Sequence, residues 1–123
     1  VLLLALMLLG CAQAASVPTC ADFARDSQAT LDRFSRLTAT AVRETGAARR
    51  TALDQMAEVQ NEYEAKLAPA CAQDLQQELN RAMNATLGAF LGVGENGNAA
   101  DDIGLTAAVL ALEDARQTID RLK

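Results

Sequence analysis

Glu44-Thr45-Gly46 lies halfway between Cys20 and Cys71, and this tripeptide determines which path the chain can take. One unbroken helix from Cys20 to Cys71 would hold the two cysteines about 75 Å apart, at 1.5 Å per residue. A disulfide needs Cα atoms about 5.5 Å apart, so a bonded pair requires the chain to reverse. Gly46 can adopt the left-handed conformation that ends a helix, and Thr45 can cap the next one. We therefore predict an antiparallel helical hairpin that turns here.

The two arms of this hairpin have similar lengths. The first runs from Cys20 to Glu44 and the second from Ala48 to Leu67, so the second arm returns Cys71 to Cys20. The alternative is one uninterrupted helix, because the residues that follow the turn, Ala47-Ala48-Arg49-Arg50, are good helix formers. Local propensity favours that single helix, whereas the matched arm lengths favour the hairpin.

Residues 1–15 are interpreted as a targeting leader that is truncated at its start, because an initiator methionine and a basic beginning are missing. Residues 1–9 form an almost unbroken apolar run, which suits the core of a secretory signal and is too short to span a bilayer. One processing route uses the small-x-small site Ala12-Gln13-Ala14, with cleavage before Ala15. The mature chain would then be a single domain over residues 16–123.

A second processing route starts from Leu8-Leu9-Gly10-Cys11, which resembles the lipobox of bacterial exported lipoproteins. The resemblance covers these four residues only, and Leu9 is a less favoured residue at its position. It implies that Cys11 receives a diacylglycerol and becomes the first residue of the mature chain. We favour this route over ordinary secretion, in which Cys11 is discarded with the leader. Either route exports the protein to the periplasm or the extracellular face, and membrane contact is expected only through an anchor on Cys11.

Export leaves two mature cysteines, Cys20 and Cys71, in a compartment where disulfides form and persist. We therefore predict that Cys20 and Cys71 form a disulfide. The alternative is two separate buried thiols, which the even cysteine count and the oxidising compartment disfavour. A metal site is a poorer interpretation, because two thiolates without histidine or a second cysteine pair do not complete a tetrahedron.

The composition indicates a folded but thinly packed helical domain. Leu, Ile, Val and Phe make up roughly a fifth of residues 16–123, near the level at which chains become disordered. The chain has sixteen acidic and eleven basic residues, and its net charge of −5 repels phosphate backbones. It has no histidine or tryptophan and one tyrosine, which removes the commonest general base and most stacking side chains. Nucleic acid is therefore not expected as a partner.

Apolar residues at spacings of three and four predict four helices, over residues 19–44, 48–67, 69–90 and 101–122. Short connections between helices of similar length favour an all-α fold, a small antiparallel up-down-up-down bundle with one disulfide. A three-helix arrangement is the alternative, in which the first two helices fuse or the last docks loosely. The expected core stripes are Phe23, Leu31, Phe34, Leu37, Ala41 and Val42; Leu53, Met56, Val59, Tyr63 and Leu67; Cys71, Leu75, Leu79, Met83, Leu87 and Phe90; and Leu105, Val109, Leu112, Ala115, Ile119 and Leu122.

Several residues mark where these helices begin. Thr19 can cap the first helix, with Asp22 at its third position, and Asp101 can cap the last. Pro69 suits the first turn of the third helix, where its missing N–H costs nothing. The many alanines have two interpretations that we weigh equally, a small-residue core with closely spaced helix axes or simply high helix propensity.

Three polar features of the sequence raise the question of a binding site. Carboxylates recur on the second helix at Asp54, Glu58 and Glu62, but successive turns place them side by side, as on a solvated face. The glycine-rich residues 92–102 do not match the spacing of a calcium-binding loop and suit turns. Residues 84–86 form a glycosylation sequon in the middle of a predicted helix, where it is best explained by chance. We expect no metal and no cofactor.

The familiar signatures of enzymes are missing from the sequence, which contains no haem attachment motif, di-iron motif, phosphate loop or nucleophile elbow. We therefore expect a non-catalytic cell-envelope module that binds a protein partner or associates with itself. The predicted binding residues lie on the last helix, outside the disulfide-closed hairpin: Leu105, Val109, Leu112 and Ile119. The alternative is a carrier that holds a small hydrophobic ligand in a cavity lined by Phe34, Met56, Met83 and Phe90.

Overall fold

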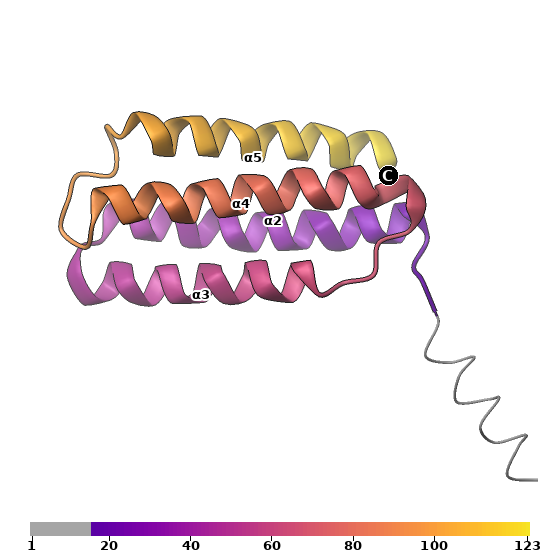
Figure 1. The fold of residues 1–123 in the computed structure, drawn as a ribbon, viewed down its shortest axis with the longest axis horizontal. Helices are drawn as coiled ribbons and strands as arrows, with labels where there is room; N and C mark the ends of the chain where they lie inside the picture. The colour runs from indigo at the N-terminus through magenta and orange to yellow at the C-terminus, as the bar shows by residue number, and fades with distance from the viewer. Residues whose placement is uncertain (1–15) are drawn as a thin grey trace, which may run out of the picture.

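Four long helices account for most of residues 16–123, the part of the chain that this computed structural model describes (Figure 1). The predicted all-α, up-down-up-down bundle with four helices is confirmed. The leader predicted for residues 1–15, Cys11 included, lies outside the described residues. The helices are α2 (Cys20–Arg43), α3 (Gly46–Glu64), α4 (Gln73–Val93) and α5 (Ile103–Leu122), and a short 3-10 helix, η1 (Ala70–Ala72), precedes α4.

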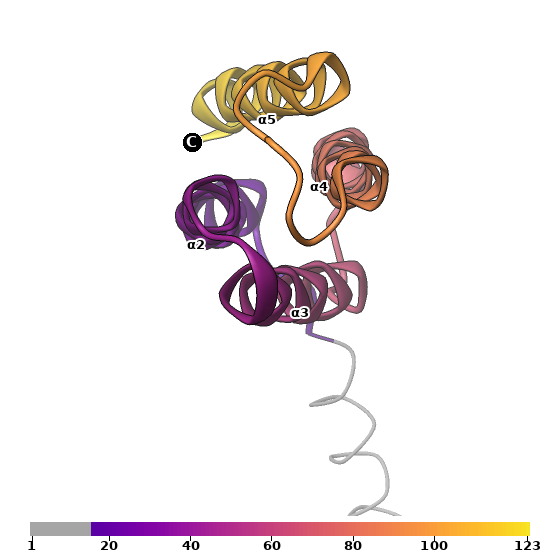
Figure 2. The ribbon, with the colours of Figure 1, turned by 90° about the vertical axis from the view of Figure 1, so that its left-hand side faces the viewer.

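The four helices are arranged as two hairpins that pack against each other. Helix α2 pairs with α3 and α4 pairs with α5, while α2 also contacts α5 and α3 also contacts α4. Seen end-on, the helices occupy the corners of a square with α2 diagonally opposite α4 (Figure 2). We call the end with Cys20 and Cys71 the disulfide end, and the end with residues 44–46 and 94–102 the loop end.

The chain reverses at Glu44-Thr45-Gly46 as predicted, so α2 and α3 are separate helices. Gly46 has a φ of +62°, in the left-handed region that favours glycine. It is the first residue of α3, two residues earlier than the predicted start at Ala48. Thr45 precedes α3 but makes no side-chain capping bond, and the Gly46 N–H instead donates to the Glu95 carbonyl at 2.8 Å. A long-range contact therefore replaces the local cap.

The second helix is shorter than the sequence predicts, because α3 ends at Glu64. The Gln76 side-chain amide of α4 donates to the Tyr63 carbonyl in the last turn of α3 at 3.2 Å and to the Lys66 carbonyl just beyond the helix at 2.8 Å. Leu67 therefore lies in an irregular connection and is exposed, so its predicted place in the core is wrong.

Cys20 and Cys71 form the predicted disulfide, which joins the start of α2 to η1 with 6.2 Å between the Cα atoms. Cys71 was predicted within a buried stripe, but it lies in η1 and is exposed. Pro69 stands directly before η1 rather than in the first turn of α4, which begins only at Gln73. The 3-10 turn places Ala72 in the core and leaves Cys71 at the surface.

The first and last helices are capped by side chains. Thr19 Oγ1 accepts a hydrogen bond from the Asp22 N–H at 3.1 Å, which confirms the predicted start of α2. The cap of α5 is Asp102, which accepts from the Leu105 N–H at 2.8 Å, and not the predicted Asp101. Asp101 instead accepts from the Asn98 side-chain amide at 3.0 Å, within the turn before the helix.

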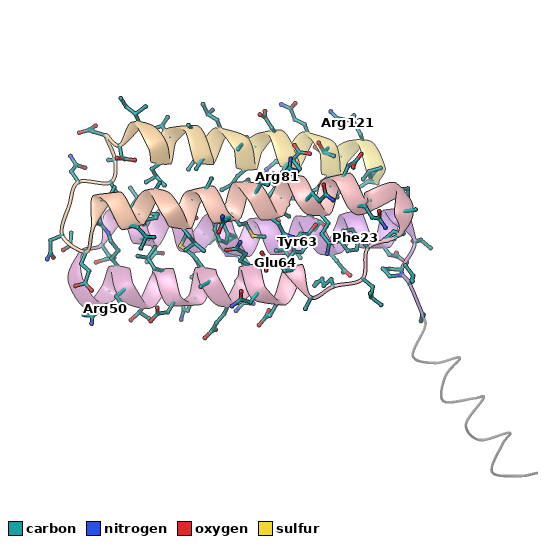
Figure 3. All side chains as sticks on the ribbon, viewed as in Figure 1. Phe23, Arg50, Tyr63, Glu64, Arg81 and Arg121 are labelled. Carbon is teal, nitrogen blue, oxygen red and sulfur yellow. A yellow bond between two sulfur atoms is a disulfide. The ribbon has the colours of Figure 1, made fainter. Side chains whose placement is uncertain are left out.

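The core combines a few large side chains with many small ones. All three phenylalanines and the single tyrosine are buried, and alanines from every helix and from η1 fill the remaining space between the helix axes. Tyr63 packs against Phe23, with ring centroids 5.8 Å apart, and its hydroxyl forms a 2.7 Å hydrogen bond with Ser27 Oγ (Figure 3). For the buried alanines, close approach of the helices is therefore the better of the two interpretations.

This tyrosine gives a first testable prediction. Burial raises the pKa of Tyr63 to about 12 from the ordinary 10.0, although the hydrogen bond with Ser27 opposes the rise. The folded state therefore binds the phenolic proton more tightly than the unfolded state. The resulting stability is present below pH 10 and is lost as the pH rises towards 12, by up to about 1.4 kcal/mol per pH unit.

Denaturant titrations between pH 10 and 12 measure this loss of stability. In Tyr63→Phe, the part of the loss that the tyrosine contributes should be absent. Because the chain has one tyrosine, tyrosinate absorbance reports on this group alone. Formation of tyrosinate in the folded protein near pH 10 would contradict the burial argument.

Candidate functional site: the loop end of the bundle

A buried arginine organises the loop end. Arg49 of α3 is 1% exposed, and its guanidinium donates three hydrogen bonds of 2.8 Å. Nε donates to the carbonyl of Ala41, while Nη1 donates to those of Gly94 and Gly97. One side chain therefore joins the end of α2 to the loop between α4 and α5.

None of these contacts joins Arg49 to a carboxylate. The surroundings of the guanidinium stabilise its positive charge in other ways. The Ala41 carbonyl belongs to the last turn of α2, and Gly94 is the residue that caps the end of α4. Carbonyls at helix C-termini lack partners within the helix and carry the negative end of the helix dipole, so a cation stabilises them. The guanidinium carbon also lies 5.8 Å from the centre of the Phe90 ring, a favourable cation–π contact.

The loop fixed in this way connects two helix segments that contain no charged residues. Between Arg81 and Glu113 the only charged residues are Glu95, Asp101 and Asp102. Arg50 pairs with Glu95 at 3.1 Å, which ties this loop to α3 a second time. The second half of α4, which precedes the loop, and the first half of α5, which follows it, therefore have uncharged outer surfaces.

Large apolar side chains are exposed on these surfaces. Ile103 and Leu91 are each 86% exposed, Leu110 is 61% exposed, and Val109 is 37% exposed. Ile103, Ala107 and Leu110 follow one another at spacings of four and three, so they lie along one side of α5. We call these three residues the α5 outer face. Apolar residues on both the inner and the outer side are typical of a helix that is covered on both sides.

Two uncharged grooves open beside these side chains. The first, of about 210 Å³, lies between the end of α2, the loop and α5. The second, of about 430 Å³, lies between α3 and α4 and includes Leu91. The first groove is lined by Val42, Ala99, Ala100, Leu105, Thr106, Val109 and Leu110, and the second by Leu53, Ala57, Asn84, Leu87, Gly88 and Leu91.

The predicted binding stripe on the last helix needs correction. Leu105, Leu112 and Ile119 are at most 3% exposed, and they hold α5 in the core. They recur every seventh residue, which keeps them on the inward side of the helix. Val109 alone of the four remains partly accessible. The predicted stripe therefore coincides with the core face of α5, and the exposed Ile103 and Leu110 were not among the predicted residues.

Helix α5 is fixed against α2 by an ion pair. Arg116 Nη1 donates to Asp32 Oδ1 at 3.0 Å, and Arg116 Nε lies 3.4 Å from a Glu113 oxygen. Partial burial opposes ionisation of Asp32, but hydrogen bonds from Arg116 and Gln28 outweigh it and hold the pKa of this carboxyl below its ordinary value. The ion pair therefore helps to determine which side of α5 faces outward.

A larger groove near the disulfide end has a different character. It measures about 470 Å³ and lies between α4 and α5, with Asp74, Glu78, Arg81 and Asp114 in its lining. The remaining lining residues are Gln77 and alanines, so the groove contains no hydroxyl, thiol or imidazole that could act as a nucleophile or neutral base. Glu78 accepts a hydrogen bond from Thr118 at 2.8 Å.

The residues predicted to line a ligand cavity all belong to the closely packed core. Phe34, Met56, Met83 and Phe90 are at most 1% exposed and belong to one buried cluster. Within residues 16–123, no three cysteine, aspartate or glutamate side chains are grouped in a way that could hold a metal ion. None of the described helices has a stretch apolar enough to cross a membrane.

Comparison of the sequence with protein-family models, with curated proteins and with solved structures found no match.

Proposed function

We propose, from the residues of the chain alone, that this protein is a non-catalytic helical module of the cell envelope that binds a protein partner, or a second copy of itself, through the loop end of its bundle. The observation that carries the proposal is the exposure of large apolar side chains on a helix whose opposite side already fills the core. Ile103 and Leu110 lie on one side of α5, and large apolar side chains exposed together on one face are a usual mark of a protein interface.

Rigidity of the loop end supports this proposal. Arg49 fixes the loop to α2 and α3, and Asp32 fixes α5 to α2. The exposed side chains are therefore presented in a fixed arrangement, which lowers the entropy cost of binding. Catalysis is not part of the proposal, because the groove of about 470 Å³ contains no hydroxyl, thiol or imidazole in its lining.

The proposed location follows from the leader. Export through residues 1–15 brings the domain to a compartment where the Cys20–Cys71 disulfide persists. An anchor at Cys11 would tether the chain five residues before Ser16, at the disulfide end. The loop end, at the far end of the bundle, would then point away from the membrane.

The proposal predicts that replacing exposed side chains at the loop end abolishes association without unfolding the protein. The double variant Ile103→Ser with Leu110→Ser should no longer cross-link to a partner in the native envelope. If the parent forms an oligomer in sedimentation experiments, the double variant should not form it. Because both side chains are largely exposed, the melting temperature should stay nearly unchanged.

A matched control is available at the other end of the bundle. Val17 and Leu67 are 52% and 60% exposed near the disulfide end, and Val17→Ser with Leu67→Ser should leave association intact. Equal loss of association in both double variants would argue against a specific interface at the loop end. So would a parent protein that forms no complex of any kind.

A further inference from the structure

Acidic residues frame the α5 outer face at both ends. Asp101 and Asp102 precede Ile103, while Glu113 and Asp114 follow the uncharged stretch that ends at Leu112. From Asp102 to Glu113 is about 16 Å along the helix axis, at 1.5 Å per residue. The apolar surface is therefore a strip roughly three turns long with negative charge at each end.

The charges near this strip do not cancel the frame. Glu113 contacts Arg116, but that guanidinium is shared with Asp32. On the α2 side of the groove, Arg43 and Glu44 are both exposed at the helix end and offset one another. On the α4 side, Arg81 lines the same groove as Asp114, but Asp74 and Glu78 line it too, so acidic side chains outnumber the basic one there. The strip therefore lies between acidic residues at both ends, in a chain with a net charge of −5.

We infer that the partner at this surface is a different protein, and that it inserts an amphipathic helix with basic residues at both ends of its apolar side. This inference rests on the proposed function and names the class of partner. Apolar side chains of that helix cover Ile103 and Leu110 and enter the groove beside Val109. Its lysines or arginines lie beside the two acidic pairs, which supply specificity and fast association.

The same acidic residues disfavour a contact between this face and the same face of a second copy of the chain. In an antiparallel contact between two α5 helices, the two-fold axis would pass near Ala107. Asp102 of one copy would then lie opposite Glu113 of the other, and Asp101 opposite Asp114. Like charges at both ends oppose this symmetric contact. Anionic lipid headgroups are repelled for the same reason.

The test uses the purified protein with its disulfide intact and two helical probe peptides. Both peptides carry the same leucine-rich apolar side; one has lysines at its two ends and the other has glutamates. The lysine peptide should bind, more weakly as salt rises, and the glutamate peptide should not. Ile103→Ser with Leu110→Ser should weaken binding at least roughly tenfold, because two apolar contacts are lost.

Charge variants show whether the acidic residues contribute to binding beyond the apolar contacts. Asp101→Asn with Asp114→Asn should weaken binding of the lysine peptide and reduce its salt dependence. Asp74→Asn and Leu67→Ser, both near the disulfide end, are the matched controls, and both should bind the lysine peptide as the parent does.

Three results would overturn the inference: no binding of the lysine peptide, equal binding of the glutamate peptide, or binding unaffected by Asp101→Asn with Asp114→Asn. A dimer of the protein that Ile103→Ser with Leu110→Ser dissolves would also overturn it. That last result would still support the proposed function, so the two claims fail separately.

Discussion

Replacing Cys20 and Cys71 together with alanine should lower the free energy of unfolding by about 4 kcal/mol. The disulfide closes a loop with a sequence separation of 51 residues, and the estimate follows from the entropy that such a loop removes from the unfolded chain. Small domains have a total margin of about 5–15 kcal/mol, so the loss is a large part of it. Urea titration of the double variant measures the change.

Reduction of the parent protein by a dithiol provides the matched comparison. It should produce a similar loss, since both treatments remove the same cross-link. Peptide mapping without reductant should recover Cys20 and Cys71 in one linked pair. Recovery of two free thiols from correctly exported protein, or unchanged stability on reduction, would contradict the prediction.

Replacing Arg49 with methionine should cost about 3–5 kcal/mol, because the variant leaves the carbonyls of Ala41, Gly94 and Gly97 without their donor. Methionine fills much of the same volume, so the effect arises from lost hydrogen bonds rather than from a cavity. Amide hydrogen exchange should accelerate at residues 94–102 before it changes near Cys71.

Arg50→Met is the matched control for this variant. Arg50 is the next residue on α3 and pairs with Glu95 at the surface, where an ion pair contributes about 0–1 kcal/mol. Similar losses from Arg49→Met and Arg50→Met would show that the buried hydrogen bonds contribute little. Uniform acceleration of exchange along the whole bundle would show that Arg49 has no local effect at the loop end.

The hairpin of α2 and α3 could be predicted from the sequence because one constraint acted over a long distance. The Cys20–Cys71 pair requires a reversal, and Gly46 is the residue between them that tolerates the left-handed conformation found there. The ends of the helices were less predictable. The chain leaves α3 where the carbonyls of Tyr63 and Lys66 accept hydrogen bonds from Gln76, twelve residues after Glu64, and periodicity contains no information about that contact.

The exposed apolar side of α5, which we propose as the binding surface, was harder to predict, because α5 is apolar on two sides. Leu105 and Leu112 are seven residues apart, and so are Ile103 and Leu110. Both pairs fit a core stripe, and only the positions of α2 and α4 determine which pair faces inward. The absence of charge between Asp102 and Glu113 was the available signal, since a solvated outer side normally carries charged residues.

Arg49 could not be distinguished from Arg50 by sequence alone. The two are adjacent on the same helix and have identical side chains, yet one is buried and the other exposed. The difference depends on carbonyls of Gly94 and Gly97, which lie 45 and 48 residues further along the chain. Such contacts follow from the completed bundle.

The disulfide also determines how the domain transmits mechanical tension. The described chain begins and ends at the same end of the bundle, where Lys123 Nζ donates to Gln28 Oε1 at 3.3 Å (Figure 1). A pull between Ser16 and Lys123 crosses from Cys20 directly to Cys71 and enters α4. Helices α2 and α3 lie inside the covalent loop and bear no load, so they cannot be extended while the cross-link remains. A domain tethered at its N-terminus would therefore keep its first hairpin unstretched under force.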